Sequence, residues 1–462
     1  MVIDKLREIE EKFRTNEILL NNEFAWRIIR PYVAGLLYEK EDGFKRNQRI
    51  SVKHILTFIY GFPKGLFKIL FGQYEMLFFS KSERRKKING IYHDRVLEGA
   101  ISLLESHSLL IESPVPVPHY PSKITATKNL ASESLFYLVQ GAVMIFIRNK
   151  VVGEEVIHEI EEKYNIRINY QQIFKRFRAQ YISMLWFLSL KKIKGSCFVA
   201  PSLYLGYVKA LKEKNIPVIE FQHGIINDQH YAYNFFDNTE SSHLPDYLLT
   251  YGNAINDLLS KSNGFIVPKN IIAAGNYYLE KLSEHAINNS NFKELKEKYE
   301  LTVAFSGQEN FEEDILNFII ESSYLDLDIL YVYVPRETKS YNNYNLPKNV
   351  VIVEWLNVYE AIILCDFHST MTSSCAIEAP VLGKQNILLD LYNQASKYYG
   401  ELLDNEKVTK YATTPQEFVE AVRSMPKVDI SEIKNSIANI FKPNHLLNIT
   451  SFFKYLKLMP ND

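Results

Sequence analysis

The sequence predicts an α/β protein with two domains, each built on a parallel sheet, and with extra helices at the N-terminus. Short apolar runs alternate with helix-sized intervals, which is typical of parallel strands joined by crossover helices. Two series of such runs occur, at residues 197–200, 218–221, 247–251 and 271–274, and then at 302–305, 329–334, 350–353, 362–364 and 387–389. A chain of 462 residues also exceeds one ordinary core.

The domain boundaries follow from where the two series of runs begin and end. We expect a first domain over residues 1–285, a second over 286–440, and a C-terminal helix within 441–462 that packs back on the first domain. The interval 283–300 contains Asn288-Asn289-Ser290-Asn291 and then a segment rich in Lys and Glu, which is typical of a connection between domains.

Before the first series, the chain is predicted to be mainly helical. The first seventy or so residues and the stretches 94–105, 132–148 and 154–190 show apolar residues at helical spacing. Strands are predicted at 74–80 and 109–112, a charged turn at 81–87, and an irregular Pro-rich segment at 114–121.

The composition excludes several classes of protein. Lys and Arg number 53 and Asp and Glu 54, whereas a nucleic-acid binder usually shows a basic excess. Cys197, Cys365 and Cys375 lack the paired spacing of a metal site, as in a reduced cytoplasmic protein. No secretory signal and no run of about 18 apolar residues is present. We expect a cytoplasmic protein that uses no metal or other cofactor.

One segment mixes apolar and basic side chains in a way that suggests a membrane surface. Residues 55–70 combine aromatic and aliphatic residues with Lys64 and Lys68, interrupted by Gly61-Phe62-Pro63. Such a segment could lie on the inner face of the plasma membrane, with its lysines near anionic headgroups. The alternative is ordinary packing in the protein interior.

The most informative motif is the hydroxyl-rich segment from Cys365 to Pro380, which follows an apolar run and leads into a predicted helix. Hydroxyl and backbone N–H groups at a helix N-terminus favour an anion, and the expected ligand is a phosphate. Its candidate ligand-binding residues are His368, Ser369, Thr370, Ser373 and Ser374. Glu378, one turn into the helix, could bind the hydroxyl groups of a ribose. The alternative is a Ser/Thr N-cap followed by an exposed Glu.

A histidine follows the predicted strand at 218–221, within Gln222-His223-Gly224. Gly224 lets the backbone turn away without steric cost, so His223 could project into a cleft between the domains. An imidazole titrates near neutrality and could take a proton from a hydroxyl or stabilise a leaving phosphate. Asp228 and His230 follow in the same loop and favour a catalytic role. The alternative is a hydrogen-bonded structural histidine.

Two further strand ends in the second series carry polar residues. Ser306-Gly307-Gln308 leads from a strand towards a helix that is predicted to begin near Phe311, and its N–H groups could meet a phosphate. The strand at 329–334 ends in Pro335-Arg336, whose guanidinium suits phosphate or carboxylate. An ordinary helix start and a surface salt bridge are the alternatives. Because ligands collect at the carboxyl ends of parallel strands, these turns and His223 are expected to converge on one cleft.

The chain resembles the two-domain, GT-B type glycosyltransferases of bacterial capsule and lipopolysaccharide synthesis, in which two Rossmann-like domains face a cleft. Residues 196–400 carry the resemblance, through Phe221-Gln222-His223-Gly224, Pro245 to Gly252, and His368-Ser369-Thr370 to Gly383-Lys384. Similar patterns occur in enzymes that transfer Kdo or nonulosonic (sialic- or pseudaminic-type) acids from CMP donors. The resemblance implies that Ser373 and Ser374 hold donor phosphate, that Glu378 meets the ribose, and that His223 faces the reacting centre.

The sequence departs from the CMP-sugar group at one position. Those enzymes usually have a His-Pro pair at the end of the second strand of the nucleotide domain, and Val334-Pro335 stands here. Arg336 or His368 could replace the missing imidazole, or the donor could differ.

The resemblance therefore implies a metal-independent glycosyltransferase that moves an acidic sugar from a CMP donor to an oligosaccharide or lipid-linked glycan. Side chains and helix termini would stabilise the departing phosphate. Asp326-Leu327-Asp328 has the form of a metal-binding triplet, but it precedes a strand and is predicted to be a turn. Three alternatives remain: a CDP-glycerol or ribitol phosphotransferase of the teichoic-acid type, a non-catalytic sugar-binding or assembly scaffold, and a nucleotide-sugar epimerase.

Overall fold

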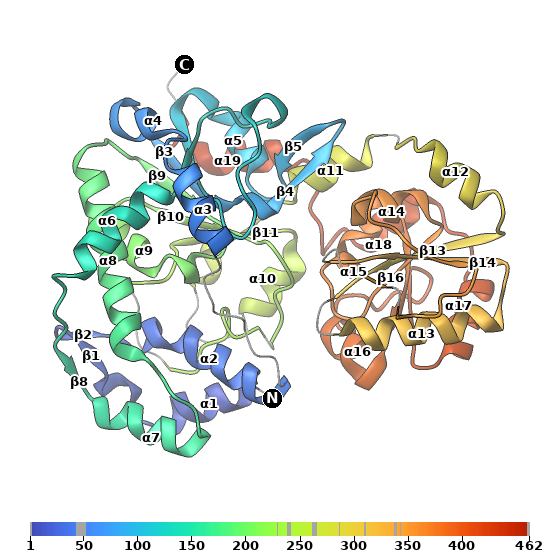
Figure 1. Ribbon diagram of the computed structural model, residues 1–462, viewed down its shortest axis with the longest axis horizontal. Helices are drawn as coiled ribbons and strands as arrows, with labels where there is room; N and C mark the ends of the chain where they lie inside the picture. The colour runs from blue at the N-terminus through green and yellow to red at the C-terminus, as the bar shows by residue number, and fades with distance from the viewer. Residues whose placement is uncertain are drawn as a thin grey trace. The chain divides into compact units, whose positions relative to one another are not determined.

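The computed structural model describes residues 2–42, 52–228, 230–237, 242–260, 266–285, 287–308, 311–336, 340–341 and 343–459. The chain divides into two compact units, Met1–Tyr278 with Asn444–Asp462, and Leu279–Pro443 (Figure 1). Each unit contains its own sheet of parallel strands. The predicted class, two α/β units with extra N-terminal helices, is confirmed. No helix within the described ranges is long and apolar enough to cross a membrane.

The first unit is built on seven parallel strands. They are β3 (Met76–Lys81), β6 (Ser108–Ser113), β7 (Leu130–Ser132), β9 (Gly195–Phe198), β10 (Val218–Phe221), β11 (Tyr247–Thr250) and β12 (Ile271–Ala273). Their spatial order is β12-β11-β10-β9-β3-β6-β7. The chain adds β6 and β7 on one side of β3 and then returns to place β9 on its other side. The strand order therefore reverses between β3 and β9.

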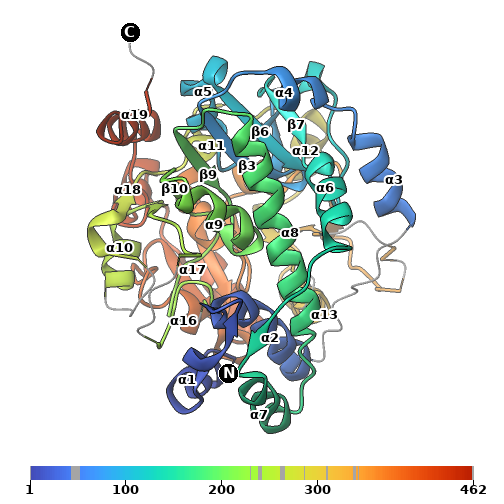
Figure 2. The same ribbon diagram turned by 90° about the vertical axis from the view of Figure 1, so that its left-hand side faces the viewer.

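Helices cover both faces of this sheet. They are α4 (Leu66–Phe71), α5 (Glu98–Leu103), α6 (Ser134–Met144), α8 (Tyr170–Ser189), α9 (Leu205–Glu213), α10 (Asn253–Ser260) and α19 (His445–Tyr455). The boundary between the two units falls within α11 (Tyr277–Ser283). Phe136, Met184 and Tyr207 pack α6, α8 and α9 on one face, which Figure 2 shows towards the viewer. Ile101 and Phe453 pack α5 and α19 in the core of the other face. Residues from both ends of the chain thus form one core.

Additional N-terminal helices make a second apolar core in the first unit. The elements are α1 (Val2–Lys12), α2 (Trp26–Asp42), α7 (Glu154–Tyr164), and a small sheet of β1 (Leu19–Leu20), β2 (Glu23–Phe24) and β8 (Val151–Val152). Helix α3 (Val52–Gly61) instead contacts α6, where the ring of Phe58 meets that of Tyr137. Leu6, Trp26 and Ile157 are buried where α1, α2 and α7 meet the first half of α8. Glu10 of α1 accepts hydrogen bonds from Trp26 Nε1 at 2.9 Å and from Phe236 N at 2.8 Å, and it pairs with Arg30.

The predicted charged turn at 81–87 is wrong. A short 3₁₀ segment at Ser82–Arg84 leads into a hairpin of β4 (Arg85–Ile88) and β5 (Ile91–Asp94). Arg85 is buried because Glu112 at the end of β6 accepts from its Nε at 2.5 Å. Because Glu112 lies 27 residues further along the chain, the local sequence indicated only a charged turn.

The second unit has six parallel strands. They are β13 (Leu301–Ser306), β14 (Ile329–Val334), β15 (Val350–Ile352), β16 (Phe367–Ser369), β17 (Gln385–Leu389) and β18 (Thr409–Ala412), in the order β15-β14-β13-β16-β17-β18. The helices are α12 (Ser290–Lys296), α13 (Glu312–Leu325), α14 (Val358–Leu364), α15 (Cys375–Glu378), α16 (Gln394–Tyr399), α17 (Pro415–Ser424) and α18 (Ile430–Ser436). Here the strand order reverses between β13 and β16.

The strand predicted at 362–364 is wrong, because these residues end helix α14. Asn357 and Glu360 form a capping box that starts this helix, and the strand is β16, three residues later. A short apolar run fits a buried helix face as well as a strand. The difference places His368 and Ser369 inside the sheet, and the predicted amphipathic helix is reduced to α15 and a 3₁₀ turn.

Candidate functional site

Each sheet presents one position where ligands are expected. In a parallel α/β sheet, ligands bind beyond the carboxyl ends of the strands at the point where the strand order reverses. In the first unit this point lies between the segment that follows β3, which contains Arg84, and the segment that follows β9, which begins at Val199. In the second unit it lies between Gly307-Gln308 after β13 and Thr370 to Ser374 after β16.

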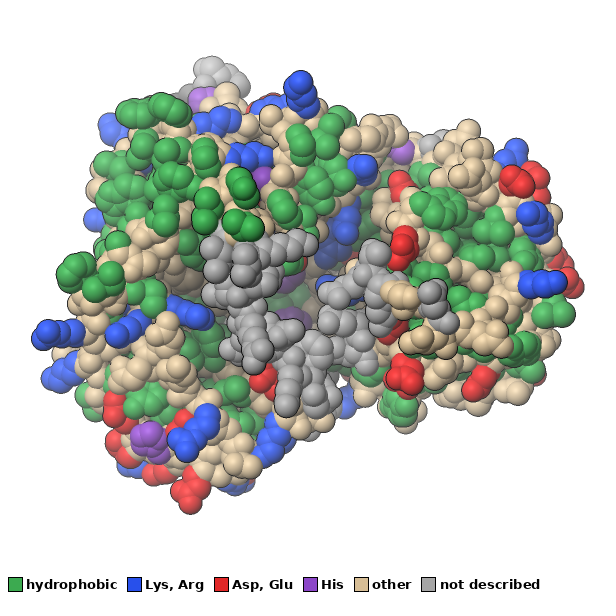
Figure 3. Space-filling model, in the orientation of Figure 1, with side chains coloured by type: hydrophobic (Ala, Val, Ile, Leu, Met, Phe, Trp, Pro, Cys, Tyr) green, Lys and Arg blue, Asp and Glu red, His purple; other side chains and the backbone are tan. Residues whose placement is uncertain are grey.

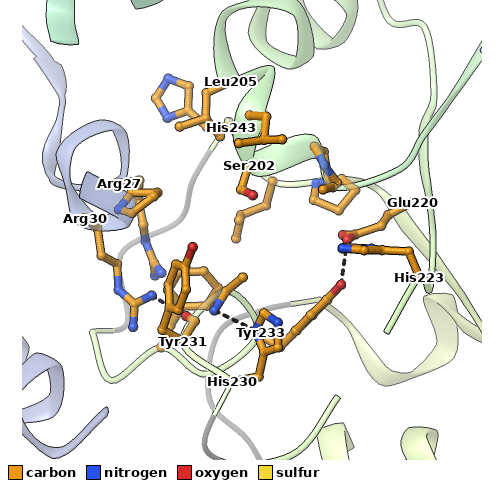
Figure 4. A pocket seen from close by; sticks show the side chains of 18 of the residues that line it. Arg27, Arg30, Ser202, Leu205, Glu220, His223, His230, Tyr231, Tyr233 and His243 are labelled. Atoms are coloured by element: carbon orange, nitrogen blue, oxygen red, sulfur yellow. Dashed lines mark hydrogen bonds between the residues drawn. The ribbon is translucent and has the colours of Figure 1, made fainter. Parts of the chain in front are cut away.

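A cavity of about 250 Å³ opens at the reversal in the first unit. Figure 4 shows three walls: Arg27 and Arg30 come from α2, Glu220 and His223 from the end of β10, and His230 with its neighbours from the loop that follows. Arg84 and residues 200–203 contribute the carboxyl ends of β3 and β9. Its volume is below the range of about 300–1,000 Å³ that holds a drug-sized ligand, so it suits a single sugar unit.

Two of the three predicted catalytic residues line this cavity. His223 and His230 do so, whereas Asp228 is exposed and lies outside the lining. Arg95 Nη2 donates to the backbone oxygen of His223 at 3.2 Å, and His223 Nδ1 is buried without a partner among the described residues. His230 Nδ1 accepts from Ala232 N at 3.3 Å, which leaves the ring proton on Nε2. None of these contacts assigns a catalytic role.

The histidines and the carboxyl group of the cavity are uncharged near neutrality. Burial, and then the charge of Arg84, hold the pKa of His223 well below its usual value. Burial lowers the pKa of His230 to about 4. Burial also raises the pKa of Glu220 to about 8, although Tyr233 donates its hydroxyl to Glu220 Oε1 at 2.8 Å. The lining therefore presents neutral acids and bases beside arginines.

The α2 wall is held in place by buried ion pairs. Arg27 pairs with Asp237, and Arg30 pairs with Glu10 and donates to the backbone oxygen of Asn234 at 2.6 Å. Both guanidinium groups lie over the ring of Phe235, at 3.7 and 4.3 Å from its centroid. These contacts fix the loop after His230 against the N-terminal helices.

Gln308 organises the reversal in the second unit. Its amide nitrogen donates to Thr372 Oγ1 at 2.7 Å, and its oxygen accepts from the backbone N–H groups of Met371 at 3.1 Å and Thr372 at 2.9 Å. At Gly307, an added Cβ would lie 2.7 Å from Tyr333 Oη and Val334 O, so a larger residue would force the turn to shift. The predicted turn is thus tightly built around Gln308.

The other predicted nucleotide-binding residues of this unit differ in accessibility. His368 is buried, and its Nε2 and Nδ1 lie 2.8 Å from Ser306 Oγ and from Asn386 Oδ1. A ligand could reach this imidazole only by breaking one of these contacts. Ser369 and Thr370 are also buried, whereas Gly307, Gln308, Ser373 and Ser374 are partly exposed.

Glu378, the predicted ribose ligand, is buried and accepts from the Tyr359 hydroxyl at 2.9 Å. Pro335 is partly exposed and Arg336 is fully exposed at the end of β14. Their roles stay predictions. Among the described residues, no group of three His, Cys, Asp or Glu side chains could hold a metal ion. The triplet at 326–328 is the predicted turn, and Arg423 Nε donates to Asp326 at 2.7 Å.

The sequence reasoning missed Arg84, Glu220 and Tyr233. Glu220 gave a signal that could have been used, since it is a carboxylate within the otherwise apolar run Val218 to Phe221. Arg84 gave a weaker signal: it lies in the charged segment 81–87 after a predicted strand, but the sequence does not show that β9 pairs with β3 and brings residues 200–203 to the same cavity.

Comparison with known proteins shows the fold. The chain is similar to the S. aureus MnaA–UDP co-structure (12% identity, 84% of this chain and 99% of that one, TM-score 0.52). It is also similar to UDP-GlcNAc 2-epimerase from Methanocaldococcus jannaschii, with 13% identity over 83% of this chain and 99% of that one and a TM-score of 0.51. A third similar structure is CalG4, the calicheamicin glycosyltransferase, with 10% identity over 84% of this chain and 100% of that one and a TM-score of 0.50. No family model and no curated protein matches the chain. At these identities the likeness shows a GT-B fold.

Proposed function

We propose that the protein is a glycosyltransferase of bacterial surface-polysaccharide synthesis, which transfers an acidic sugar of the Kdo or nonulosonic type from a CMP donor to a glycan acceptor. The observation that carries the proposal is that both strand-order reversals are lined by polar groups suited to such substrates. A partly exposed turn of hydroxyl and amide groups occupies one reversal, and a sugar-sized cavity with neutral imidazoles occupies the other. The GT-B fold of the chain supports a sugar-processing enzyme.

The donor nucleotide is assigned to the second unit. Ser373 and Ser374 would bind its phosphate, and Gln308 would hold the turn in the required shape. Binding of the ribose by Glu378 would require the contact with Tyr359 to open. The structure described with UDP supports a nucleotide ligand for this fold, whereas the preference for CMP rests on the sequence motifs.

His223 is assigned to the acceptor. An acceptor hydroxyl would attack the anomeric carbon of the donor, the bond between that carbon and the phosphate oxygen would break, and CMP would leave with the electron pair. The hydroxyl proton would pass to His223, which is uncharged at neutral pH and can accept it. Asp228 and His230 of the same loop would contact the acceptor.

Transfer assays with the purified protein test this assignment. We expect turnover of a CMP-linked sugar acid in the presence of a glycan acceptor, a loss of at least a hundredfold in kcat for His223→Ala, and unchanged activity for the control His158→Ala, whose ring is exposed. Nucleotide binding, measured by thermal shift with CMP, CDP and UDP, should survive in both variants. Turnover of CDP-glycerol instead would support the phosphotransferase. Full activity of His223→Ala would refute the role of the imidazole.

Epimerisation of a nucleotide sugar is the second candidate. It is favoured by the similarity to UDP-GlcNAc 2-epimerase, which extends over 83% of this chain. The two reactions differ in their need for an acceptor. Conversion of a UDP-sugar without an acceptor, followed by NMR of the sugar protons, would select the epimerase and exclude transfer.

We also propose that the protein works in the cytoplasm at the inner face of the plasma membrane, through an exposed apolar surface of the first unit. This α3/α4/α6 face comprises Ile59, Tyr60, Phe67, Phe71, Ile145 and Phe146. The exposed fractions of Tyr60, Phe67 and Phe146 are 79%, 77% and 82%. Figure 3 shows apolar side chains gathered over α3, α4 and α6. The sequence suggested residues 55–70 as the segment that contacts the membrane. Among the apolar residues described from 56 to 70, Ile69 alone is fully buried.

The charge composition of the helices α3, α4, α6 and α8 fits an anionic lipid surface. Residues 52–72, 134–150 and 170–192, which include α3, α4, α6 and α8, contain ten Lys and Arg and no Asp or Glu, although acidic residues make up 54 of the 462. Each Lys or Arg near an anionic bilayer contributes about 1 kcal/mol, and each inserted Phe up to about 1.5–3 kcal/mol. Together these terms suffice for reversible binding.

Vesicle cosedimentation tests the membrane contact. We expect binding to vesicles that contain phosphatidylglycerol, weaker binding to pure phosphatidylcholine, and at least tenfold weaker binding of the double variant Phe67→Ser/Phe71→Ser. The matched control is Tyr324→Ser/Leu327→Ser, which removes two exposed apolar residues from the second unit. Equal binding of both double variants would contradict the proposed face.

A further inference from the structure

One arginine of the first cavity is without a counter-ion. Arg84 lines the cavity, and no salt bridge or side-chain hydrogen bond is formed by it within the described part of the chain. Its Nε is buried without a partner. The two arginines of the α2 wall differ, because Arg27 pairs with Asp237 and Arg30 with Glu10. Among the described residues, Arg84 is therefore the arginine of the lining that has no counter-ion, although Nε and Nη1 of Arg27 also lack hydrogen-bond partners.

No carboxylate among the described residues binds Arg84 directly. Asp94 accepts from the Ser80 hydroxyl at 2.5 Å and from two backbone N–H groups. Glu112 binds Arg85 and His119 at 2.5 and 2.7 Å. Glu83 is exposed, and it acts on Arg84 only through space, as Asp94 does. The remaining acid of the lining, Glu220, is buried and uncharged at neutral pH.

A second cation lies beside the first. Arg95 follows β5 and donates to the backbone oxygen of His223, and Arg84 and Arg95 are close enough for each to disfavour the charge of the other. Burying a guanidinium without an anion costs several kcal/mol. An anion that enters the cavity would remove this cost, and a guanidinium can bind a carboxylate or a phosphate with two parallel hydrogen bonds.

We propose that this cavity is an anion subsite, in which Arg84 binds the carboxylate or phosphate of a sugar substrate next to His223. Identifying the ligand as a sugar rests on the proposed function, whereas the binding of an anion does not. A bound anion would also act on His223, because it offsets the charges of Arg84 and Arg95 that now disfavour protonation of the imidazole. The substrate would thus make its own base stronger.

Calorimetric titration of the intact protein tests the subsite with three probes: N-acetylneuraminate, glucose 6-phosphate and uncharged glucose. We expect at least one anionic probe to bind and glucose to bind at least tenfold more weakly. The anionic probe that binds more tightly identifies the source of the charge. Arg84→Gln should weaken that probe at least tenfold, while the control Arg167→Gln, an exposed arginine of the same unit, should not. Equal affinity for glucose, or an unchanged affinity in Arg84→Gln, would overturn the proposal.

Two further readouts separate this role from a merely structural one. The melting temperature of unliganded Arg84→Gln should equal or exceed that of the parent, because a cation without a counter-ion is removed. The NMR titration of His223 should move to higher pH when the anionic probe is present, and this movement should be lost in Arg84→Gln. CMP and UDP binding, measured separately, reports on the donor. If nucleotides bind and anionic sugars do not, only the subsite fails. If neither binds, the proposed function fails as well.

Discussion

Replacing Glu220 by Gln should make the first unit more stable at neutral pH. Glu220 is 3% exposed in the middle strands of the sheet, and burial raises its pKa to about 8 from an ordinary value of 4.5. Between these two values the folded protein holds a proton that the unfolded chain releases. The free energy of unfolding therefore decreases as the pH rises through this window, by at most about 1.4 kcal/mol per pH unit. Gln does not titrate and avoids this loss.

The magnitude follows from the width of the window. From about pH 5.5 to about pH 7.5 the parent should lose about 2.5 kcal/mol relative to Glu220→Gln. A unit of this size unfolds with an entropy of about 0.6 kcal/mol per kelvin, so the difference in melting temperature should grow by about 4 °C over this range. A Gln amide left without a partner would lower the free energy of unfolding of the variant by about 1–3 kcal/mol, and equally at both ends of this pH range. The pH dependence is therefore the diagnostic quantity.

Differential scanning calorimetry of the parent and Glu220→Gln at several pH values measures this difference directly. The matched control is Glu105→Gln, which removes an exposed carboxylate of the same unit and should leave the difference flat. If the melting temperatures of parent and Glu220→Gln stay parallel from acidic to neutral pH, Glu220 is ionised in the folded protein and the reasoning fails. The conclusion that the acids and bases of the cavity lining are uncharged at neutral pH would then be wrong.

Three further substitutions test the packing around the two sites. Glu10→Ala leaves Arg30 as a buried charge without its carboxylate, and we expect a loss of about 3–5 kcal/mol in the unfolding transition of the first unit. His368→Ala removes two buried hydrogen bonds and opens a void, so calorimetry should show the second unit alone destabilised, by about 2–4 kcal/mol. Gly206→Ala would place a Cβ 2.3 Å from a backbone oxygen of α8 and should cost about 1–3 kcal/mol. Gly141→Ala is its control: the added Cβ meets nothing and should stabilise α6 by about 0.5–1 kcal/mol.

Regular alternation of strands and helices could be read from the chain because it is a local property. The runs 218–221 and 329–334 were expected as strands, and they coincide with β10 and β14. The apolar run before Cys365 was predicted as a strand and is helical, because four apolar residues fit either state and the capping box at Asn357 starts a helix. The other error, the charged turn predicted at 81–87, arose from a buried charge. Arg85 is buried because it pairs with Glu112, and only the fold brings these two residues together.

In the candidate sites, the residues at strand ends could be predicted from the sequence, but the residues of other elements that line the same site could not. His223 and Gln308 stand directly after apolar runs, and the structure places both at carboxyl edges of sheets. Arg84 could be assigned to the cavity only with the strand order, because that order determines which loops share a cavity. His368 illustrates the opposite case: its position in a hydroxyl-rich motif suggested a ligand, and its place inside β16 gives both ring nitrogens partners within the protein.

Helix α19 has a consequence for how this chain comes into being. Ile449, Phe452 and Phe453 complete a core that also includes residues of α5 and of strands β3, β6, β7, β9, β10 and β11, so the first unit stays unfinished until translation has passed residue 453. By then the whole of Leu279–Pro443 has already been synthesised. Domains usually mature in the order of their synthesis. In this protein we expect the second unit to fold first, although it is synthesised later. Until α19 has been made, the first unit would expose the apolar surface that this helix covers.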